Sequence, residues 1–331
     1  MKTLIDRIFR ASVFLPLRIF LSFFYALAVG IRNKCYDVGV IKTQHVGIPI
    51  LSVGNISVGG TGKTILSQAL ARYFQDKGQR PAILSRGYGR KSRGLQIVSD
   101  GSHVISSVSD SGDEPFLMAK NLPGVPVLVA EDRVAGAKHI NEHFSSDVII
   151  LDDAFQHRRI HRDLDILLLD NSGLVRSHVL PWGHLRENMD ATKRADMILT
   201  TKSAISNTDD HEFLLTPGNM LVNYQGQSVG LEEVRGGFGV FSGLGNNAYF
   251  FRMVEDHIAA PSFMVSLPDH CDYTDADLAR IPFHKTSFWV TTQKDMIKLP
   301  EALCDQHNIL YLGVEGTLPR PLLARLKHHF K

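Results

Sequence analysis

A glycine-rich segment around residue 60 carries the residue types that bind a nucleoside triphosphate. Glycines expose backbone N–H groups that can surround phosphate oxygens, and the positive end of a following helix dipole adds to the attraction. Lys63 would reach the β- and γ-phosphates, and the Thr64 hydroxyl would bind Mg²⁺. The full set of nucleotide-contacting residues that we expect is Ser57, Val58, Gly59, Gly60, Thr61, Gly62, Lys63 and Thr64. This loop follows an apolar run and precedes a helical pattern, which is the order that a P-loop requires.

One position of this loop departs from the strict P-loop pattern. Ser57 stands where the pattern has a glycine, five residues before Gly62. The core sequence Gly-Gly-Thr-Gly-Lys-Thr at 59–64 is intact. A glycine-rich turn that only packs against its neighbours is the alternative, but the intact core between strand and helix favours nucleotide binding.

Two aspartates follow a buried-strand pattern. The run Val-Ile-Ile-Leu at 148–151 is followed by Asp152 and Asp153. An apolar run that ends in aspartate is common and is mostly structural. Behind a P-loop in the same sheet, however, such carboxylates supply the hard oxygen ligands that Mg²⁺ needs. We therefore expect these two residues to contact the metal or its water.

Asp113 and Glu114 open a short helical pattern, and they admit two interpretations. The helix dipole favours acidic residues at a helix N-terminus, which would make them capping residues. They could instead form a base and a metal ligand that point at the γ-phosphate, although composition alone favours capping. His270 lies in a loop next to Asp269, where a carboxylate could orient a general base. Most isolated histidines are not catalytic, and this one could be structural too.

Two polar segments follow predicted strands at the sheet edge where open α/β sheets bind ligands. Residues 153–163 combine histidines and arginines, and residues 85–90 occupy the equivalent position after an earlier strand. Both segments suit a phosphorylated or polyhydroxyl acceptor. A solvated basic loop is the alternative for each.

Buried-strand patterns alternate with helical patterns along most of the chain. Unalternating apolar runs between helices indicate a parallel sheet covered on both faces, so the expected fold class is α/β with a P-loop NTPase-type sheet. The predicted strands are 81–84, 127–130, 147–151, 165–169 and 197–200, and the predicted helices are 65–75, 112–122 and 133–144.

The regular pattern loosens near 203–211, and residues 225–239 are consistent with a linker or hairpin. A second alternation follows, with strands at 239–241, 262–266 and 287–291 and helices at 246–255, 275–280 and 321–329. We therefore expect three parts: an N-terminal membrane-associated helix at 1–34, a P-loop core at 35–225, and a smaller C-terminal α/β domain at 226–331.

Composition places the chain among folded proteins with a sizeable core. Its 331 residues exceed the roughly 100–200 of an ordinary domain, so two domains are expected. A net charge of +2 and the lack of a lysine-rich tail argue against nucleic acid as a partner. Three distant cysteines show neither a disulfide framework nor zinc-ligand spacing, which fits a reducing compartment.

Residues 11–31 form an apolar stretch with Arg18 as its only charge and Pro16 as a break. A cleaved signal peptide would send a P-loop to a compartment without ATP, and its cleavage site at 26–28 is poor. A full membrane span needs about 20 apolar residues and would bury Arg18 at bilayer depth. A helix in the membrane interface, with arginines at the lipid headgroups, fits better. A buried helix of the soluble core is the remaining alternative.

Together these segments resemble the tetraacyldisaccharide 4'-kinase family, the lipid A 4'-kinases, over essentially the whole chain. The most specific block is Leu-Asp-Asp-Ala-Phe-Gln-His-Arg-Arg-Ile-His-Arg-Asp at 151–163. The other matching blocks are an apolar N-terminal segment with Tyr25, Arg32 and Tyr36, then 53–64, 85–90, 113–115, 180–187, 241–246, 269–270 and 291–295. This family also carries Ser or Thr at position 57. The chain departs from the usual family residues Ala, Pro, Pro and Glu at Trp182, His184, Asn247 and Gln293.

The resemblance implies a reaction, its cofactors and its place in the cell. The γ-phosphoryl group of ATP would pass, with Mg²⁺, to the 4'-hydroxyl of a tetraacylated glucosamine disaccharide 1-phosphate, forming lipid IVA in lipid A biosynthesis. The reaction would take place at the cytoplasmic face of the inner membrane of a Gram-negative bacterium. The implied partners are this lipid substrate and the membrane surface, with no nucleic acid and no obligate protein partner.

The resemblance also implies roles for individual residues. Asp113 matches the general base, paired with His270, and Lys63 matches the Walker A lysine. The acidic Mg²⁺ and active-site set, together with the Walker A hydroxyl, is matched by Thr64, Glu114, Asp152, Asp153 and Glu187. If the members of the pair lie on different domains, closing the domains would assemble the pair and exclude water, which limits idle ATP hydrolysis.

Two other function classes are compatible with a P-loop. A membrane-associated NTPase could use hydrolysis as a conformational switch or act as a metal-centre chaperone. Guanine specificity usually needs an Asn/Thr-Lys-x-Asp turn, and Thr-Gln-Lys-Asp at 292–295 has its lysine one position late. A non-catalytic nucleotide-binding module anchored to a membrane is the second alternative, in which Asp113, His270 and Asp153 would be dispensable for turnover.

Overall fold

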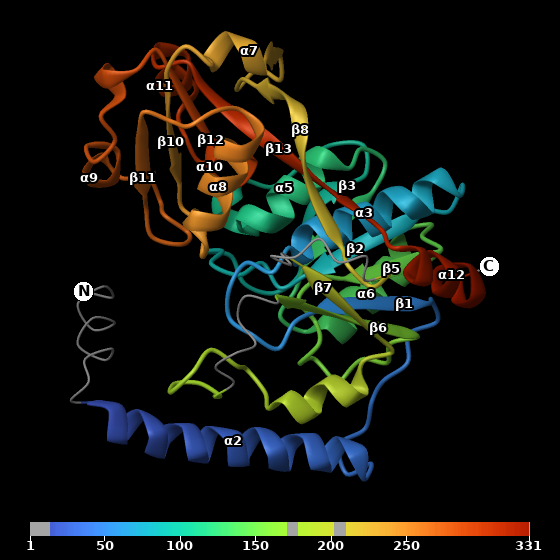
Figure 1. The fold of residues 1–331 in the computed structure, drawn as a ribbon. Coiled ribbons are helices and arrows are strands. Elements are labelled where there is room, and N and C mark those ends of the chain that lie inside the picture. Colours follow the sequence, from blue (N-terminus) through green and yellow to red (C-terminus); the bar gives the residue numbers. More distant parts are fainter. Residues whose placement is uncertain (1–13, 171–177, 202–209, 331) are drawn as a thin grey trace.

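The structure is a computed structural model that describes residues 14–170, 178–201 and 210–330. Two sheets carry helices on their faces, and a long N-terminal helix lies along one side (Figure 1). The α/β class expected from the sequence is therefore confirmed. Most of the loosely patterned segment expected at 203–211 lies outside the described residues.

The first sheet is largely parallel and holds the P-loop strand near its middle. Its strands are β1 (Ile50–Gly54), β2 (Pro81–Ser85), β3 (Gln96–Asp100), β4 (Pro126–Val129), β5 (Val148–Leu151), β6 (Leu164–Asp170) and β7 (Met197–Thr201). They lie in the order β3-β4-β2-β5-β1-β6-β7, and only the β3–β4 pair is antiparallel. Strands β1, β2 and β5 are buried along their whole length, as continuous apolar runs between two layers of helices require.

Helices cover both faces of this sheet. Leu66, Leu70 and Phe74 repeat at helical spacing on α3 (Lys63–Asp76) and pack on one face. The same core includes residues of α5 (Asp113–Asn121), which follows the short α4 (Val108–Ser111), and of the C-terminal helix α12 (Arg320–His329). Helix α6 (Arg133–His143) packs on the opposite face. The expected helices and strands of this half are thus present near their predicted bounds, and β3 is an edge strand that the sequence analysis did not predict.

The second sheet is smaller and mixed. Its strands are β8 (Leu214–Val222), β9 (Ser228–Gly230), β10 (Phe238–Ser242), β11 (Phe263–Ser266), β12 (Phe288–Thr292) and β13 (Ile309–Thr317), in the order β11-β10-β12-β13-β8-β9. The helices of this half are α7 (Leu231–Val234), α8 (Asn247–His257), α9 (Asp275–Leu278), α10 (Gln293–Met296) and α11 (Glu301–Gln306), with 3₁₀ turns η2 (Met189–Arg194) before it and η3 (Phe283–Lys285) within it.

Two long antiparallel strands connect the halves of the molecule. Strand β8 leaves the first half and pairs with β13, whose chain then returns to the first sheet as α12 (Figure 1). Neither strand was predicted, because β8 contains Pro217 and Gly218 and only short apolar runs. Membership of the second sheet therefore begins at Leu214, before residue 226, and the last helix belongs to the core of the first sheet.

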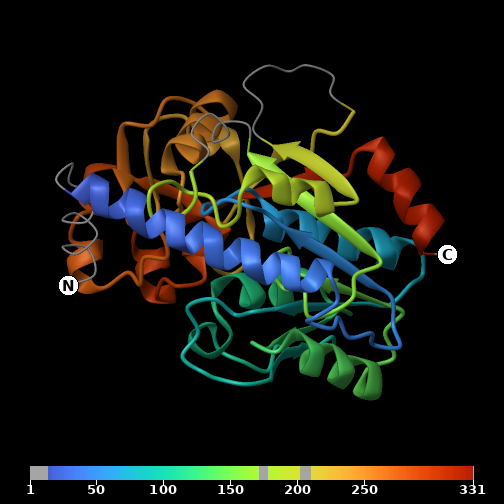
Figure 2. The ribbon, with the colours of Figure 1, turned by 90° about the horizontal axis from the view of Figure 1, so that it is seen from below.

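Helix α2 (Leu15–Asp37) runs along the side of the first half, beside the loop at 178–188 (Figures 1 and 2). It is long and apolar enough to cross a membrane by length and composition, and only 6% of its most apolar 18-residue window is buried. Large side chains exposed along it include Phe20, Phe23, Phe24, Leu27 and Ile31. A soluble core helix would bury such a row, so the buried-core alternative is not supported by this packing.

Candidate active site

The P-loop joins the end of β1 to the start of α3. Gly62 precedes the first helical residue with φ +90°, a left-handed conformation that a side chain would strain. Gly54 ends β1, and a Cβ atom there would lie 2.5 Å from the Cβ of Phe155, so only glycine fits. The buried Thr61 accepts a hydrogen bond from Asn55 Nδ2 at 3.2 Å. These constraints fix the loop so that its backbone can surround a phosphate.

Lys63 is nearly buried at the start of α3 and faces the strand that carries the two aspartates. Its Nζ lies 3.7 Å from Asp153 Oδ1, and Arg186 Nη1 lies 3.0 Å from both oxygens of the same carboxylate. Asp153 also has a left-handed φ of +50°, a costly conformation for a residue other than glycine. Burial raises the pKa of Asp153, but Lys63 and Arg186 outweigh it and lower that pKa overall.

Asp152 lies at the bottom of the same site and is 1% exposed. It accepts hydrogen bonds from Ser67 Oγ at 2.8 Å and from Ser85 Oγ at 3.3 Å. Burial first, and then the neighbouring charges of Glu114 and Asp153, raise its pKa to about 7. Crowded carboxylates of this kind are stabilised by a cation.

Glu114 links the P-loop to the second half of the molecule. Its Oε2 accepts a hydrogen bond from Thr64 Oγ1 at 3.1 Å, and its Oε1 lies 3.3 Å from Lys294 Nζ. Burial acts to raise the pKa of Glu114, but Lys294 and Lys63 lower it overall. Glu114 therefore contacts the P-loop, in addition to lying at a helix N-terminus.

The oxygen atoms around the P-loop fit Mg²⁺ bound together with a nucleotide. A hydroxyl from Thr64 and carboxylates from Glu114, Asp152 and Asp153 are the hard ligands that this ion prefers. Among the described residues, no group of three or more His, Cys, Asp or Glu side chains could hold a metal by itself. Mg²⁺ usually takes one or two carboxylates plus substrate phosphates and waters, so an incomplete protein ligand set is the expected one.

Asp113 and His270 meet across the two halves of the molecule. His270 Nδ1 lies 3.1 Å from Asp113 Oδ2, and Lys298 Nζ lies 3.2 Å from the same oxygen. Burial acts to raise the pKa of Asp113, but the hydrogen bond from His270 and the charges of Lys298 and Lys294 hold it at about 2. His270 has a left-handed φ of +55°, and its loop follows β11. The two residues that the sequence analysis paired are thus brought into contact.

Glu187 does not join this group. It is 1% exposed, and it accepts hydrogen bonds from Arg194 Nη1 at 2.9 Å and Asn33 Nδ2 at 2.6 Å, with Arg32 at 3.7 Å. Within the described part of the chain, its carboxylate makes no hydrogen bond or ion pair to Lys63, Thr64 or the other predicted Mg²⁺ ligands. Both of its oxygens are occupied by cationic or amide donors, which tie α2 to the core, and its expected role as a metal ligand stays a prediction.

A second set of basic groups lies beyond Asp153, where strands β2, β4 and β5 end. Arg133 is 3% exposed and donates to Ala130 O at 3.1 Å, while its Nε is buried without a partner among the described residues. Burial, followed by the charge of Arg86, lowers the pKa of Arg133 to about 10. Burial and Arg133 together lower the pKa of His157 to about 4, and His157 Nε2 is likewise buried without a described partner.

Four of the five arginines in the basic segments 85–90 and 153–163 form ion pairs, Arg86 being the exception among the described contacts. These pairs are Arg90 with Glu131, Arg158 with Asp37, Arg159 with Asp132 and Arg162 with Asp165. The sequence alone could not separate these paired cations from Arg133, which it did not single out. Pairing depends on partners that lie up to 121 residues away along the chain.

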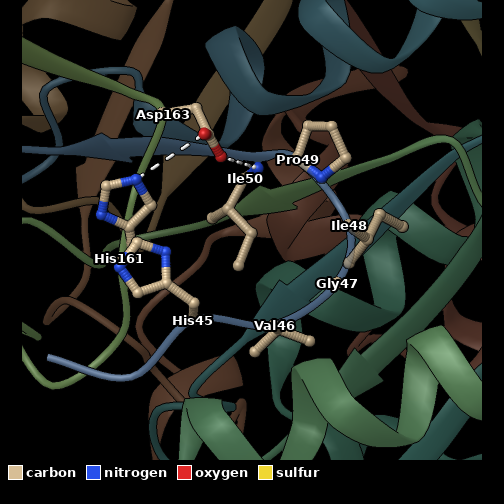
Figure 3. A pocket seen from close by; sticks show the side chains of 8 residues that line it. All are labelled: His45, Val46, Gly47, Ile48, Pro49, Ile50, His161 and Asp163. Atoms are coloured by element: carbon tan, nitrogen blue, oxygen red, sulfur yellow. Dashed lines mark hydrogen bonds and ion pairs between the residues drawn. The ribbon is translucent and has the colours of Figure 1, made fainter.

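A hollow of about 210 Å³ lies away from this site, at the other end of β1 (Figure 3). It is lined by His45, Val46, Gly47, Ile48, Pro49, Ile50, His161 and Asp163. The rings of His45 and His161 stack with their centroids 4.0 Å apart, and Asp163 accepts the Ile50 N–H at 2.7 Å. Because β1 starts at Ile50 and the P-loop follows its other end, this hollow is not part of the nucleotide site.

Comparisons with known proteins agree with this geometry. The family model described as "Tetraacyldisaccharide-1-P 4'-kinase" matches residues 14–331. A tetraacyldisaccharide 4'-kinase from Aquifex aeolicus is 40% identical over 288 residues, covering 84% of this chain and 88% of the relative. One from Geobacter metallireducens is 37% identical over 319 residues, covering 91% and 94%. A crystal structure of LpxK from Aquifex aeolicus in complex with ATP superposes with a TM-score of 0.79 at 36% identity, covering 97% of this chain and 99% of that one.

Proposed function

The chain belongs to the tetraacyldisaccharide 4'-kinase family, and from this membership we propose how its residues divide the work of phosphoryl transfer. The enzyme transfers the γ-phosphoryl group of ATP to the 4'-hydroxyl of tetraacyldisaccharide 1-phosphate, forming lipid IVA in lipid A biosynthesis. The observation that carries the proposed roles is the 3.1 Å contact between Asp113 and His270, directly beside a P-loop.

The nucleotide is held by the P-loop, residues 57–64. Lys63 binds the β- and γ-phosphates, and Thr64, Glu114, Asp152 and Asp153 hold Mg²⁺. When bound, the ion would supply positive charge that neutralises the charge developing on the phosphates. The hydrogen bond between Thr64 and Glu114 holds these two expected metal ligands next to each other. Hydrogen bonds from Ser67 and Ser85 orient the carboxylate of Asp152.

Asp113 accepts the proton of the 4'-hydroxyl as its oxygen forms a bond to the γ-phosphorus and the bond to ADP breaks. A pKa of about 2 keeps this carboxylate ionised and ready to accept a hydrogen bond from the hydroxyl. Such a weak base suits phosphoryl transfer, whose loose transition state places little charge on the attacking oxygen. The main contribution of Asp113 is therefore orientation of the hydroxyl in line with the phosphate.

His270 fixes the position of Asp113. Lys294 Nζ lies 3.4 Å from His270 Nε2, and an ammonium group can only donate, so Nε2 is the acceptor. The remaining nitrogen, Nδ1, then carries the proton and donates it to Asp113 Oδ2. This assignment of the tautomer follows from the hydrogen-bond partners.

The acceptor lies on the other side of Asp153, at Arg133 and His157. Their buried nitrogens point to an anionic group as the missing partner, and the acceptor carries a 1-phosphate. Arg86, whose charge influences Arg133, completes a cationic site at the ends of three parallel strands. An Arg133→Ala variant should therefore raise the KM for the lipid acceptor far more than the KM for ATP.

Helix α2 presents the active site to a membrane surface, and its exposed phenylalanines enter the interface. Basic residues at both ends of its apolar stretch suit anionic headgroups. A reaction that consumes ATP requires the cytoplasmic face of the inner membrane. The three parts expected at 1–34, 35–225 and 226–331 stay a proposal, in which β8 extends the second sheet back to Leu214 and α12 packs on the P-loop core. No obligate protein partner is proposed.

Purified enzyme with radiolabelled ATP, Mg²⁺ and the disaccharide acceptor tests the proposal. Label should appear in the lipid, and a His270→Ala variant should lose most of this transfer while it still binds ATP. Hydrolysis of ATP that does not depend on acceptor would instead indicate a hydrolysis-driven switch, and nucleotide binding without turnover would indicate a non-catalytic module. Full transfer activity in His270→Ala would contradict the role given to the pair.

A further inference from the structure

Lys294 lies where the second sheet meets the P-loop core, and its only role so far is to set the tautomer of His270. It is the second residue of α10, which starts directly after β12. Its side chain is 14% exposed, and its Nζ lies 3.3 Å from Glu114 Oε1 and 3.4 Å from His270 Nε2. A lysine this enclosed, between two residues of the active site, needs a functional explanation.

The backbone that carries Lys294 is fixed independently of these contacts. Thr292 caps α10 by accepting the Asp295 N–H at 3.1 Å. Asp295 is fully buried and accepts hydrogen bonds from Thr292 Oγ1 at 2.7 Å and from the Gly243 N–H at 3.1 Å. The Thr-Gln-Lys-Asp segment at 292–295, which does not match the guanine-binding motif, thus forms a rigid turn that directs the Lys294 side chain toward the P-loop core.

The segments that follow strands β10 and β12 of the second sheet lie next to the P-loop. Gly243 and Gly245 follow β10, and a Cβ atom on Gly245 would lie 3.6 Å from the backbone nitrogen of Gly60. Lys294 follows the neighbouring β12, and its partner Glu114 also accepts the hydrogen bond from Thr64. The carboxylate of Glu114 therefore lies between the ammonium group of Lys294 and the hydroxyl of Thr64, which is expected beside the terminal phosphates.

An ammonium group has three N–H donors, and the contacts to Glu114 and His270 use two of them. The third has no partner among the residues that the structure describes, so a further acceptor can take it. Lys63 approaches the phosphates from the P-loop side, and Lys294 comes from the opposite half of the molecule. Two lysines on either side of a transferring phosphoryl group are an effective arrangement for neutralising its charge.

We propose that Lys294 is a ligand of the γ-phosphate of ATP, delivered to the P-loop by the second sheet. In the absence of nucleotide, the ammonium group of Lys294 contacts Glu114. Once Glu114 serves as a metal ligand, the carboxylate holds the lysine less strongly, and Lys294 Nζ donates to a γ-phosphate oxygen. This inference rests on the proposed function, in which ATP is the phosphoryl donor. It means that a residue outside the P-loop contacts the γ-phosphate and so distinguishes ATP from ADP.

The test compares a non-hydrolysable imido analogue of ATP with ADP, both with Mg²⁺ and without lipid acceptor, by calorimetry. Loss of a charge-assisted hydrogen bond should raise the Kd of Lys294→Gln for the analogue by about tenfold or more. The Kd for ADP, which lacks the γ-phosphate, should change by less than about twofold on the same reasoning. Lys285→Gln removes an exposed lysine of the same half and should leave both values unchanged.

An equal rise for both nucleotides would overturn the proposal, because it would mean that Lys294 acts only by neutralising Glu114. Unchanged affinities would overturn it as well. Thermal melting of each variant checks folding, and Lys294→Met, with a similar length and no charge, replaces Lys294→Gln if that variant unfolds. Because the measurement needs no acceptor, its outcome is separate from the proposed lipid kinase activity, which the labelled-lipid assay tests.

Discussion

The P-loop core is bound on two sides by contacts of different chemistry. On the α2 side, side chains of the helix donate to backbone carbonyls of the 178–187 loop: Arg18 to Pro181 and Trp182, Ser22 to Val179, and Tyr25 to Arg186, at 2.8–3.1 Å. On the side of the second sheet, the contacts join charged side chains around Asp113 and Glu114.

The two kinds of contact should respond differently to ligands. A backbone carbonyl has the same charge whether or not nucleotide is bound, and the charged contacts of α2, such as those of Arg32 and Asn33 with Glu187, do not involve Lys63 or Thr64 in the described part of the chain. We therefore expect α2 to keep its place on the core when nucleotide binds. The lysine–carboxylate contacts depend on the charge of the site, which changes when Mg²⁺ and phosphates enter. We therefore expect the first side to provide permanent attachment and the second to provide contacts that ligands rearrange.

The largest effect should come from Asp113→Asn, which removes the base from the ligand-sensitive side. Transfer to the lipid should fall by about 10²–10⁴-fold, the usual contribution of a positioned general base. Asp113 contacts His270 and Lys298 rather than the P-loop, so ATP affinity should be retained. Single-turnover transfer and nucleotide binding measure the two quantities. Asp110→Asn, on the exposed helix just before it, is the matched control, and equal losses in the two variants would contradict the assignment.

Asp152→Asn should separate stability from function on the same side. The pKa of Asp152 is raised to about 7 from an ordinary 3.8, so between these values the folded protein holds a proton that the unfolded chain releases. The stability of the metal-free protein should therefore fall as pH rises from about 4 to 7, by an amount on the order of a few kcal/mol. Asparagine is neutral at every pH, so Asp152→Asn should not show this loss of stability as the pH rises.

Urea unfolding in EDTA at pH 5 and pH 8 measures this effect. Wild type should be less stable at pH 8 than at pH 5, and Asp152→Asn should flatten the difference while it abolishes Mg²⁺-dependent transfer. Asp163→Asn alters a half-exposed carboxylate at the other end of the sheet and serves as the control. An undiminished pH dependence in Asp152→Asn would assign the titration to another group.

Tyr25→Phe should produce a smaller effect on the α2 side. It removes the hydrogen bond to the Arg186 carbonyl, which should cost about 0.5–1.5 kcal/mol of unfolding free energy. Binding to anionic vesicles should be unchanged, because Tyr25 faces the core. Phe23→Ser, at a side chain that is 65% exposed, should do the reverse: weaker vesicle binding with unchanged stability. If both variants moved both quantities together, α2 would not have separate membrane and core faces.

The sequence predicted the parts of the site that depend on local pattern. The P-loop, the strand before Asp152, and the helix opened by Asp113 and Glu114 are local features. The two acids lie at a helix N-terminus and also contact His270 and Thr64. Lys294 and Lys298 were missed because their partners lie 180 and 185 residues away in the chain, and short-range patterns carry no such information. The partners of Glu187, two arginines and an asparagine, could likewise not be predicted, because Asn33 and Arg32 lie more than 150 residues before it in the chain.

The smallest effect should come from Gln293→Glu, which restores the residue usual in the family. Gln293 and Asn121 exchange two hydrogen bonds at 2.8 and 2.9 Å, and this pair fastens α10 to α5. A glutamate can still accept from Asn121 Nδ2, but it cannot donate to Asn121 Oδ1. The amide of Asn121 is unable to turn and compensate, because its Nδ2 also donates to Gln68 at 2.9 Å.

Water can reach this half-buried pair, so the lost bond should cost only about 0.5 kcal/mol, at the low end for a neutral hydrogen bond. A double-mutant cycle with Gln293→Ala and Asn121→Ala measures the pair directly in urea unfolding, and its coupling energy should be about 0.5–1 kcal/mol. A coupling energy of zero would mean that the lysine–carboxylate contacts alone hold the second sheet against α5. In that case the charged contacts would provide attachment as well as catalysis, and the distinction between the two sides of the core would fail.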